Sequence, residues 1–272
     1  MNKLALGGAT WIAADIHLGP QGPGTAARFH DFLQQAAREC DALILCGDIF
    51  NAWVGDDQIG APEPWLTSAM QAMQAVSRRK KLYLMRGNRD FLLGERFAQA
   101  VGATLLPEGL RLSTPAGDFW LTHGDELCTD DRAYQRFRRV VRIPLVQKLF
   151  LSCPLAWRQG LAAYFRRRSQ QAGQYKSPTI TDVNEQAWQA LLERQGLSVL
   201  VHGHTHRPAI HRNSRQESER ANDTKRYYRI VLPDWEADHS HPPRYGWLCV
   251  DALGFALHQA SGMERLARQQ PD

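Results

Sequence analysis

Five short apolar runs of this chain each end directly at a motif made of Asp, Asn or His residues. Apolar runs of this length predict buried strands, and the motifs that follow them predict loops. Because the carboxyl ends of neighbouring strands meet at one edge of a sheet, we expect all five motifs at one rim of a sheet. The runs are Trp11–Ala14, Leu43–Cys46, Leu82–Met85, Phe119–Thr122 and Leu197–Val201.

The segments between these runs predict a mixed α/β fold. Residues 25–39 and 65–79 carry apolar side chains at helical spacing, which predicts βαβ units in the first 106 residues. From Leu110 to Thr122 the pattern is that of a hairpin. Residues 132–168 are predicted to be helical with breaks at Pro144 and Pro154, and another helix is predicted at 182–195.

The last part of the chain predicts closing strands at 227–232, 245–250 and 255–258. Residues 212–226 are almost wholly polar, so we interpret them as a mobile loop that does not touch the chemistry. We interpret the tail after Glu264 in the same way.

Composition excludes several classes of protein. The five cysteines are odd in number and widely spaced, with no CxxC pair, which favours reduced thiols in a cytosolic protein over disulfides or a thiolate zinc site. No run of 18 apolar residues is present, so no transmembrane helix is expected. The apolar stretch near the N-terminus is interrupted by glycines and leads into Asp15, so we interpret it as a strand rather than a secretion signal.

The five motifs carry the ligands of a metal site. They are Asp15-x-His17, Gly47-Asp48, Gly87-Asn88-Arg89-Asp90, His123-Gly124-Asp125 and His202-Gly203-His204-Thr205-His206. Taken singly, most have an ordinary structural explanation, such as a helix cap, a strand-exit turn or a structural histidine. In an extended segment, residues i and i+2 point to the same side, so Asp15 and His17 can meet one ion, and His204 and His206 share this spacing. Together the motifs offer oxygen and nitrogen donors without thiolates, which favours Mn²⁺, Fe²⁺ or Zn²⁺ over a structural zinc cage.

In this order the motifs resemble those of the calcineurin-like metallophosphoesterases. The resemblance implies a four-layer αββα sandwich with two metal ions at its rim. It implies that one ion is held by Asp15, His17 and His206, the other by Asn88, His123 and His204, and that Asp48 bridges them. His202 lies outside the matched pattern, and we interpret it as a supporting or structural residue.

The resemblance also implies the reaction type. Two divalent ions can share a water and deliver hydroxide near neutral pH, and they neutralise charge that develops on phosphate oxygens. We expect Asp48, Arg89 and His204 to act in catalysis. Many members of the superfamily carry His where this chain has Arg89. A permanently charged guanidinium suits phosphate binding rather than proton transfer.

The longer segments around the ligands resemble one family more closely, the UDP-2,3-diacylglucosamine diphosphatases of lipid A synthesis. They are ADIHLG (14–19), GDIFNAWVGDD (47–57), GNRDFLLGERF (87–97), HGDELCTDD (123–131) and HGHTHRPAIH (202–211). This resemblance implies hydrolysis of UDP-2,3-diacylglucosamine to UMP and 2,3-diacylglucosamine 1-phosphate (lipid X) by a metal-bridged hydroxide, with two Mn²⁺ or alternatively Fe²⁺ or Zn²⁺. The substrate contacts it implies are Asn88, Arg89, Asp131, Ser169, Lys176 and His204. Gly173 stands where the family often has Asn, which puts that contact in doubt.

The charge distribution agrees with a lipid substrate. From Arg132 to Thr181 there is no Asp or Glu but eleven basic residues, interleaved with apolar ones. Such a segment suits anionic lipid headgroups, although a solvated basic face or a nucleic-acid surface has the same composition. In the resembled family this insertion is a helical cap that holds the acyl chains. We therefore predict a core at 1–131 and 182–264, a cap at 132–181 and a tail at 265–272.

These observations favour a cytoplasmic enzyme that is peripheral on the inner membrane, with an acylated UDP-sugar as substrate, no nucleic acid and no obligatory protein partner. The competing hypotheses are a metallophosphoesterase for a soluble nucleotide and a non-catalytic scaffold. The first predicts a cap without space for acyl chains. The second predicts lost ligands, and all seven are present.

Overall fold

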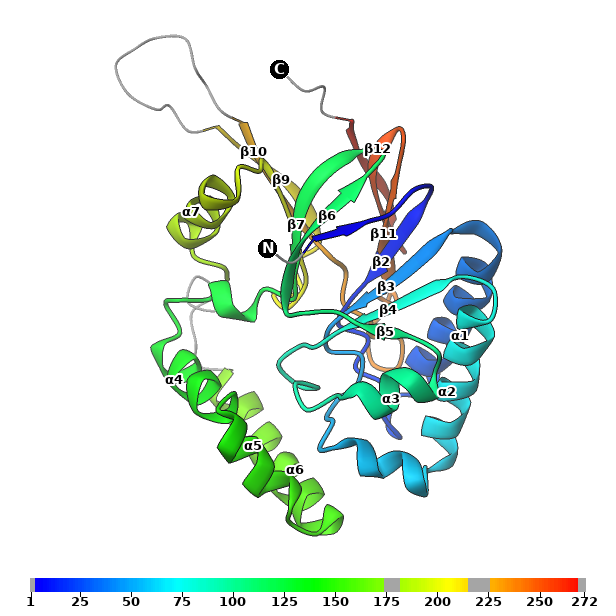
Figure 1. The fold of residues 1–272 in the computed structure, drawn as a ribbon, viewed down its shortest axis with the longest axis vertical. Helices are drawn as coiled ribbons and strands as arrows, with labels where there is room; N and C mark the ends of the chain where they lie inside the picture. The colour runs from blue at the N-terminus through cyan, green and yellow to red at the C-terminus, as the bar shows by residue number, and fades with distance from the viewer. Residues whose placement is uncertain (1–2, 174–181, 215–225, 269–272) are drawn as a thin grey trace.

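Two β-sheets pack face to face, and helices cover the outer side of each (Figure 1). The computed structural model describes residues 3–173, 182–214 and 226–268. Side chains of both sheets share one buried cluster, which includes Ile12, Ile44, Phe119 and Val201. The predicted αββα sandwich is confirmed.

The first sheet has seven strands in the order β13-β12-β11-β2-β3-β4-β5. Its strands β2 to β5 are parallel, whereas β11 runs antiparallel to β2 and continues into two antiparallel strands. The strands are β2 (Thr10–Ala13), β3 (Ala42–Cys46), β4 (Lys81–Met85), β5 (Thr104–Leu105), β11 (Gly246–Asp251), β12 (Gly254–Gln259) and β13 (Gly262–Ala267).

The second sheet has six strands in the order β1-β6-β7-β8-β10-β9. The predicted hairpin forms its β6-β7 pair, and β8 lies parallel to both β7 and β10. The strands are β1 (Lys3–Ala5), β6 (Gly109–Thr114), β7 (Gly117–Thr122), β8 (Val199–His202), β9 (Ala209–Ser214) and β10 (Arg226–Val231).

The apolar runs are continuous because both faces of their strands are buried. Along β2 and β3, Ile12 and Ile44 face the second sheet, whereas Trp11 and Leu43 face the helices. The helices on that side are α1 (Pro23–Glu39), α2 (Pro64–Ser77) and α3 (Glu95–Ala100). On the opposite side, α7 (Glu185–Gln195) packs Trp188 and Leu192 against the second sheet.

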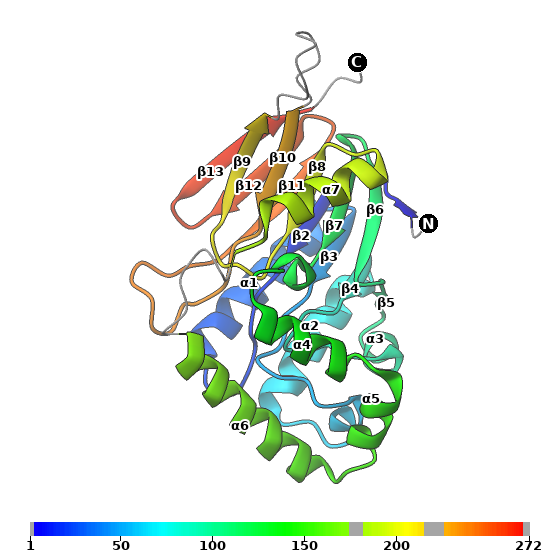
Figure 2. The same ribbon diagram turned by 90° about the vertical axis from the view of Figure 1, so that its left-hand side faces the viewer.

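Three further helices lie outside both sheets (Figures 1 and 2). They are α4 (Arg132–Val141), α5 (Pro144–Leu151) and α6 (Leu155–Gly173). The breaks fall at Pro144 and Pro154, as predicted, because a proline lacks the amide that would continue a helix. The assignment of 132–181 as a separate cap stays a prediction.

Three sequence predictions need correction. Residues 265–267 belong to β13, which pairs with β12, so they are not tail. Residues 212–214 and 226 belong to β9 and β10, so the predicted loop is shorter at both ends, and the rest of it lies outside the described residues. The metal motifs follow strands of two sheets, not one. β9 and β13 were not predicted because both are edge strands, which need no continuous apolar run, and their composition is mixed with polar residues.

Candidate metal centre

All seven predicted ligands come together where the two sheets meet. Asp15, His17 and His206 form one group whose ligand atoms lie within 4.8 Å of one another, and Asp15, Asp48 and His123 form a second. His17 Nε2 lies 3.2 Å from His206 Nε2.

The remaining two ligands adjoin the second group. Asn88 Oδ1 lies 3.0 Å from His123 Nε2 and 2.8 Å from His204 Nδ1. The amide oxygen of Asn88 thus faces both rings. His202 lies outside both groups: it is buried, and its ring packs against Gly124.

Five of the seven predicted ligands have a left-handed backbone conformation. Within the described residues, the non-glycine residues with positive φ are Asp15, His17, Asp48, His204 and His206, with φ between 51° and 67°. This conformation costs an L-residue about 1–2 kcal/mol, and such strain clusters at functional sites. The expectation that extended backbone aligns each i, i+2 pair was therefore wrong. Asp15 and His17 instead converge through two left-handed residues. His204 and His206 have the same backbone conformation, but His204 faces Asn88 whereas His206 faces Asp15 and His17.

A buried carboxylate fixes the loops after β3 and β4. Asp90 Oδ1 accepts from the backbone amides of Gly87, at 2.7 Å, and Asp48, at 3.2 Å, while its Oδ2 accepts from Ile49 at 2.7 Å. A side chain on Gly87 would collide with the backbone and carboxylate of Asp48. Gly87 is required for this close approach rather than for a left-handed turn.

The charges of the site are strongly coupled. Burial would raise the pKa of Asp15, but the His206 ring, whose Nε2 lies 3.5 Å from Asp15 Oδ1, holds it below its ordinary value. Burial raises the pKa of Asp48 to about 6. Burial disfavours a charged His123, but Asp48 and Asp15 raise its pKa to about 9. Burial lowers the pKa of His204 to about 4, so its ring is neutral at pH 7, the form that binds a metal.

Arg89 lies at the mouth of the site. Its side chain is 29% exposed, and its Nε lies 3.5 Å from Asp48 Oδ2. Its backbone amide donates to Asp48 Oδ1 at 2.8 Å, and Nη1 donates to Asn51. One face of this guanidinium thus stays available to an anion beside the carboxylate.

The other predicted substrate contacts are placed in part. Asp131 caps α4, where its Oδ1 accepts from the Tyr134 amide at 3.1 Å. Gly173 ends α6. The side chain of Ser169 and the whole of Lys176 lie outside the described residues.

Two supporting carboxylates, Asp234 and Asp125, had no role assigned to them from the sequence. Asp234 is buried, and its Oδ2 lies 3.7 Å from His206 Nδ1 and 2.9 Å from Arg244 Nη2. It follows β10 by three positions and has neither a glycine nor a histidine beside it, so it does not resemble the other motifs. Asp125 accepts from the Tyr134 hydroxyl at 2.6 Å, and the Tyr134 ring stacks beside His204.

Residues 9–208 match the model of the calcineurin-like phosphoesterases. The chain belongs to this family. A UDP-2,3-diacylglucosamine hydrolase of Bordetella parapertussis is 51% identical over 93% of this chain and 96% of its own length. Proteins of the same name from Serratia proteamaculans and Yersinia enterocolitica are 46% and 43% identical over 85% of this chain, and over 92% and 93% of their own lengths. The closer resemblance predicted from the motifs is confirmed.

Proposed function

We propose that this protein is a metal-dependent diphosphatase that hydrolyses UDP-2,3-diacylglucosamine to UMP and 2,3-diacylglucosamine 1-phosphate. The observation that carries the proposal is identity of up to 51% along almost the full length of proteins named UDP-2,3-diacylglucosamine hydrolase. Identity that spans core and helical segment alike supports a shared substrate as well as a shared reaction.

The donor set fits two divalent ions, which we propose to be Mn²⁺. Asp15, His17 and His206 would hold one ion, and Asn88, His123 and His204 the other. Among the residues that the structure describes, Asp15 Oδ1 and His17 Nδ1 are buried and find no hydrogen-bond partner, which leaves both atoms available to an ion. Fe²⁺ and Zn²⁺ suit the same donors.

The placement of Asp48 supports its role as the bridge. Its Oδ1 lies 3.5 Å from His123 Nε2 and its Oδ2 lies 3.9 Å from His17 Nδ1, so one carboxylate faces both groups. Two divalent cations bound here would supply Lewis-acid activation of water and neutralise phosphate oxygens.

We propose that side chains of the protein bind and orient the substrate. Arg89 would bind a phosphate oxygen through its exposed guanidinium face and hold the diphosphate in line for attack. Asp125 and Tyr134 would orient His204 against the substrate. We propose the substrate contacts Asn88, Arg89, Asp131, Ser169, Lys176 and His204 on the strength of the matching motifs.

The helices α4 to α6 suit a lipid substrate. They expose large apolar side chains, several of them more than half exposed, beside many basic ones. Such a surface suits acyl chains and an anionic membrane face. The exposed apolar residues are Phe137, Val140, Ile143, Leu145, Leu149, Leu151, Trp157, Tyr164 and Phe165.

We further propose that the enzyme acts in the cytoplasm as a peripheral protein of the inner membrane. Within the described residues, no helix has both the length and the apolarity that a membrane span needs. Attachment would therefore come from the exposed apolar and basic surface of α4 to α6, strengthened by anionic lipid.

The test is a comparison of substrates with the purified, Mn²⁺-loaded protein. We expect turnover of the acylated UDP-sugar to exceed that of dinucleoside polyphosphates and cyclic nucleotides by orders of magnitude. Equal or faster hydrolysis of a soluble nucleotide would refute the lipid assignment while leaving the hydrolase assignment intact.

A further inference from the structure

The segment GDIFNAWVGDD (47–57) contains more than the metal centre needs. Of its three aspartates, only Asp48 belongs to the ligand groups. Asp57 lies in the 3-10 helix η1 (Asp56–Gly60), where it contacts Arg158 of α6, 101 residues further along the chain. This end of the segment therefore joins the core to the helices outside it.

Arg158 is unlike the other basic residues of α4 to α6. Within the described part of the chain, it is the one Arg or Lys that is fully buried, at 2% exposure. Its guanidinium pairs with both carboxylate oxygens of Asp57 and donates to the Val54 carbonyl, while Nε donates to the Cys153 carbonyl at 2.9 Å. A buried guanidinium without these partners would carry a large desolvation cost, so the contacts fix where α6 begins.

The core side of this contact is shaped to receive the guanidinium. Gly55 has φ +138°, and a side chain there would collide with Arg158 Nη1 and with the Leu151 side chain. Asp56, beside Asp57, accepts from Trp53 Nε1 and from the amides of Gly94 and Phe97. The loop that presents Asp57 is thereby fixed to the core.

The same loop reaches the metal centre. The amide of Trp53 donates to the carbonyl of Arg89 at 3.0 Å. The loop thus connects the start of α6 to the residue proposed to bind phosphate.

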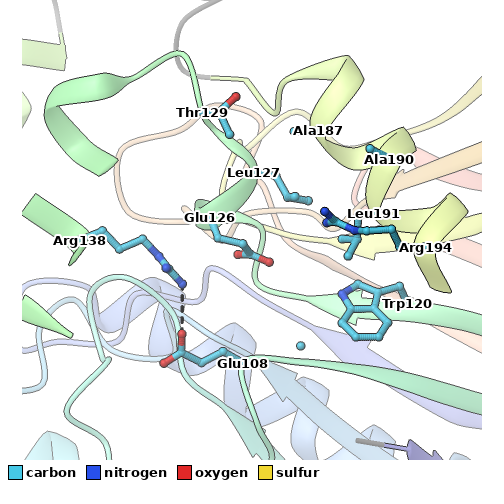
Figure 3. Close-up of a pocket in the computed structure, with 11 residues that line it drawn as sticks. Glu108, Trp120, Glu126, Leu127, Thr129, Arg138, Ala187, Ala190, Leu191 and Arg194 are labelled. Atoms are coloured by element: carbon cyan, nitrogen blue, oxygen red, sulfur yellow. Dashed lines mark hydrogen bonds and ion pairs between the residues drawn. The ribbon is translucent and has the colours of Figure 1, made fainter. Parts of the chain in front are cut away.

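The near end of the helical segment is held separately. Arg138 of α4 donates to Asp125 at 2.7 Å. It also donates to Glu108 at 3.1 Å (Figure 3). Arg142 pairs with Glu108 and donates to the Gly87 carbonyl at 3.2 Å. The helical segment α4 to α6 is therefore held to the core at two places: by Arg138 and Arg142 near α4, and by the contact of Arg158 with Asp57 at the start of α6.

We infer that Asp57 and Arg158 are positioning residues that hold α5 and α6 at a fixed place relative to the metal centre, and so set the affinity for the acylated substrate without taking part in the chemistry. This inference rests on the proposed function for its substrate, but its structural half does not. Residues that merely stabilised the fold would affect every activity of the protein alike.

The test compares Asp57→Asn and Arg158→Gln with Arg38→Gln, which removes the same positive charge as Arg158→Gln but from an exposed position of α1. Three quantities are measured: KM and kcat for the acylated UDP-sugar, hydrolysis of bis(p-nitrophenyl) phosphate, and hydrogen exchange of residues 155–168. We expect the first two variants to raise KM about tenfold with kcat nearly unchanged, to keep small-diester hydrolysis, and to exchange faster in 155–168. Arg38→Gln should match the parent protein in all three.

Unchanged hydrogen exchange of residues 155–168 in both variants would overturn the inference. An equal loss of activity on the acylated substrate and on the small diester would overturn it as well. Arg158→Gln risks misfolding, but Asp57→Asn changes a half-exposed carboxylate, so its result decides the case. If the parent protein itself fails to hydrolyse the acylated substrate, the proposed function fails, while faster exchange in Asp57→Asn would still support the tie.

Discussion

Two regions of the molecule are built in opposite ways: the rim where the two sheets meet, which carries the candidate metal centre, and the helices α4 to α6 outside it. At the rim, buried polar side chains are fixed by backbone amides and left-handed residues, as Asp90 and Asp48 illustrate. In α4 to α6, large apolar side chains such as Leu145 and Leu149 are exposed, and arginine contacts tie the helices to the core. The difference is the one expected if, as proposed, the chemistry is built into the fold and substrate selection belongs to the surface of α4 to α6, which could vary without disturbing the metal centre.

The largest effect should come from the rim. Asp48→Ala removes the carboxylate that faces both ligand groups, so hydrolysis of the acylated substrate and of a small diester should both fall by about 10³-fold or more. Metal analysis should show less than the full Mn²⁺ content. Near-normal rates would refute the bridging role. Loss of activity on the acylated substrate alone would refute the proposal that the rim carries the chemistry and the helices the substrate selection.

The residues around the ligands should matter less than the ligands. Asp234→Asn weakens the carboxylate beside His206, and loss of such a partner typically lowers metal affinity about 10–100-fold. Titration of the metal-free protein with Mn²⁺ measures this directly. Asp118→Asn, which breaks a surface ion pair with Arg111 far from the site, is the matched control. Identical Mn²⁺ affinity in the two variants would exclude a positioning role for Asp234.

The two regions also differ in how much of each could be predicted from the sequence. The position of the rim was predictable because each predicted ligand lies in a motif that follows an apolar run, and the side chains of all seven lie close together. The backbone conformation of these residues was not predictable, because the residue types of Asp15 and His206 do not indicate a left-handed conformation. Asp234 was missed because it stands alone after its strand, without a glycine or histidine beside it.

The helices were predictable in number and breaks but not in position. Pro144 and Pro154 divide them, and their composition pointed to a lipid surface. Their attachment was not predictable, since Arg158 is one of eleven basic residues of the segment and nothing in the sequence distinguishes it. Only burial singles it out.

The exposed apolar surface should change binding and leave the chemistry intact. Leu149→Ser and Trp157→Ser alter side chains that are 61% and 55% exposed, so folding should lose little. If these side chains contact acyl chains, each variant should raise KM for the acylated substrate about tenfold, given about 1.5–3 kcal/mol for burial of a large apolar side chain. Hydrolysis of a small diester is the control. An unchanged KM in both variants would place the acyl chains elsewhere.

The smallest predicted effect is a pH dependence of the tie between α6 and the core. The hydrogen bond from Arg158 lowers the pKa of the Asp57 carboxyl below its ordinary value. A depressed folded-state pKa means that the stabilisation is complete above the unfolded pKa, about 3.9, and is lost as pH falls through the folded value. The melting temperature of the parent protein should therefore exceed that of Asp57→Asn by about 1–2 °C near neutral pH, because a half-exposed ion pair is well screened. Below the folded pKa the difference should vanish. A difference that persisted there would show that Asp57→Asn acts through something other than the lost charge, and the tie would then depend on the shape of the loop rather than on the ion pair.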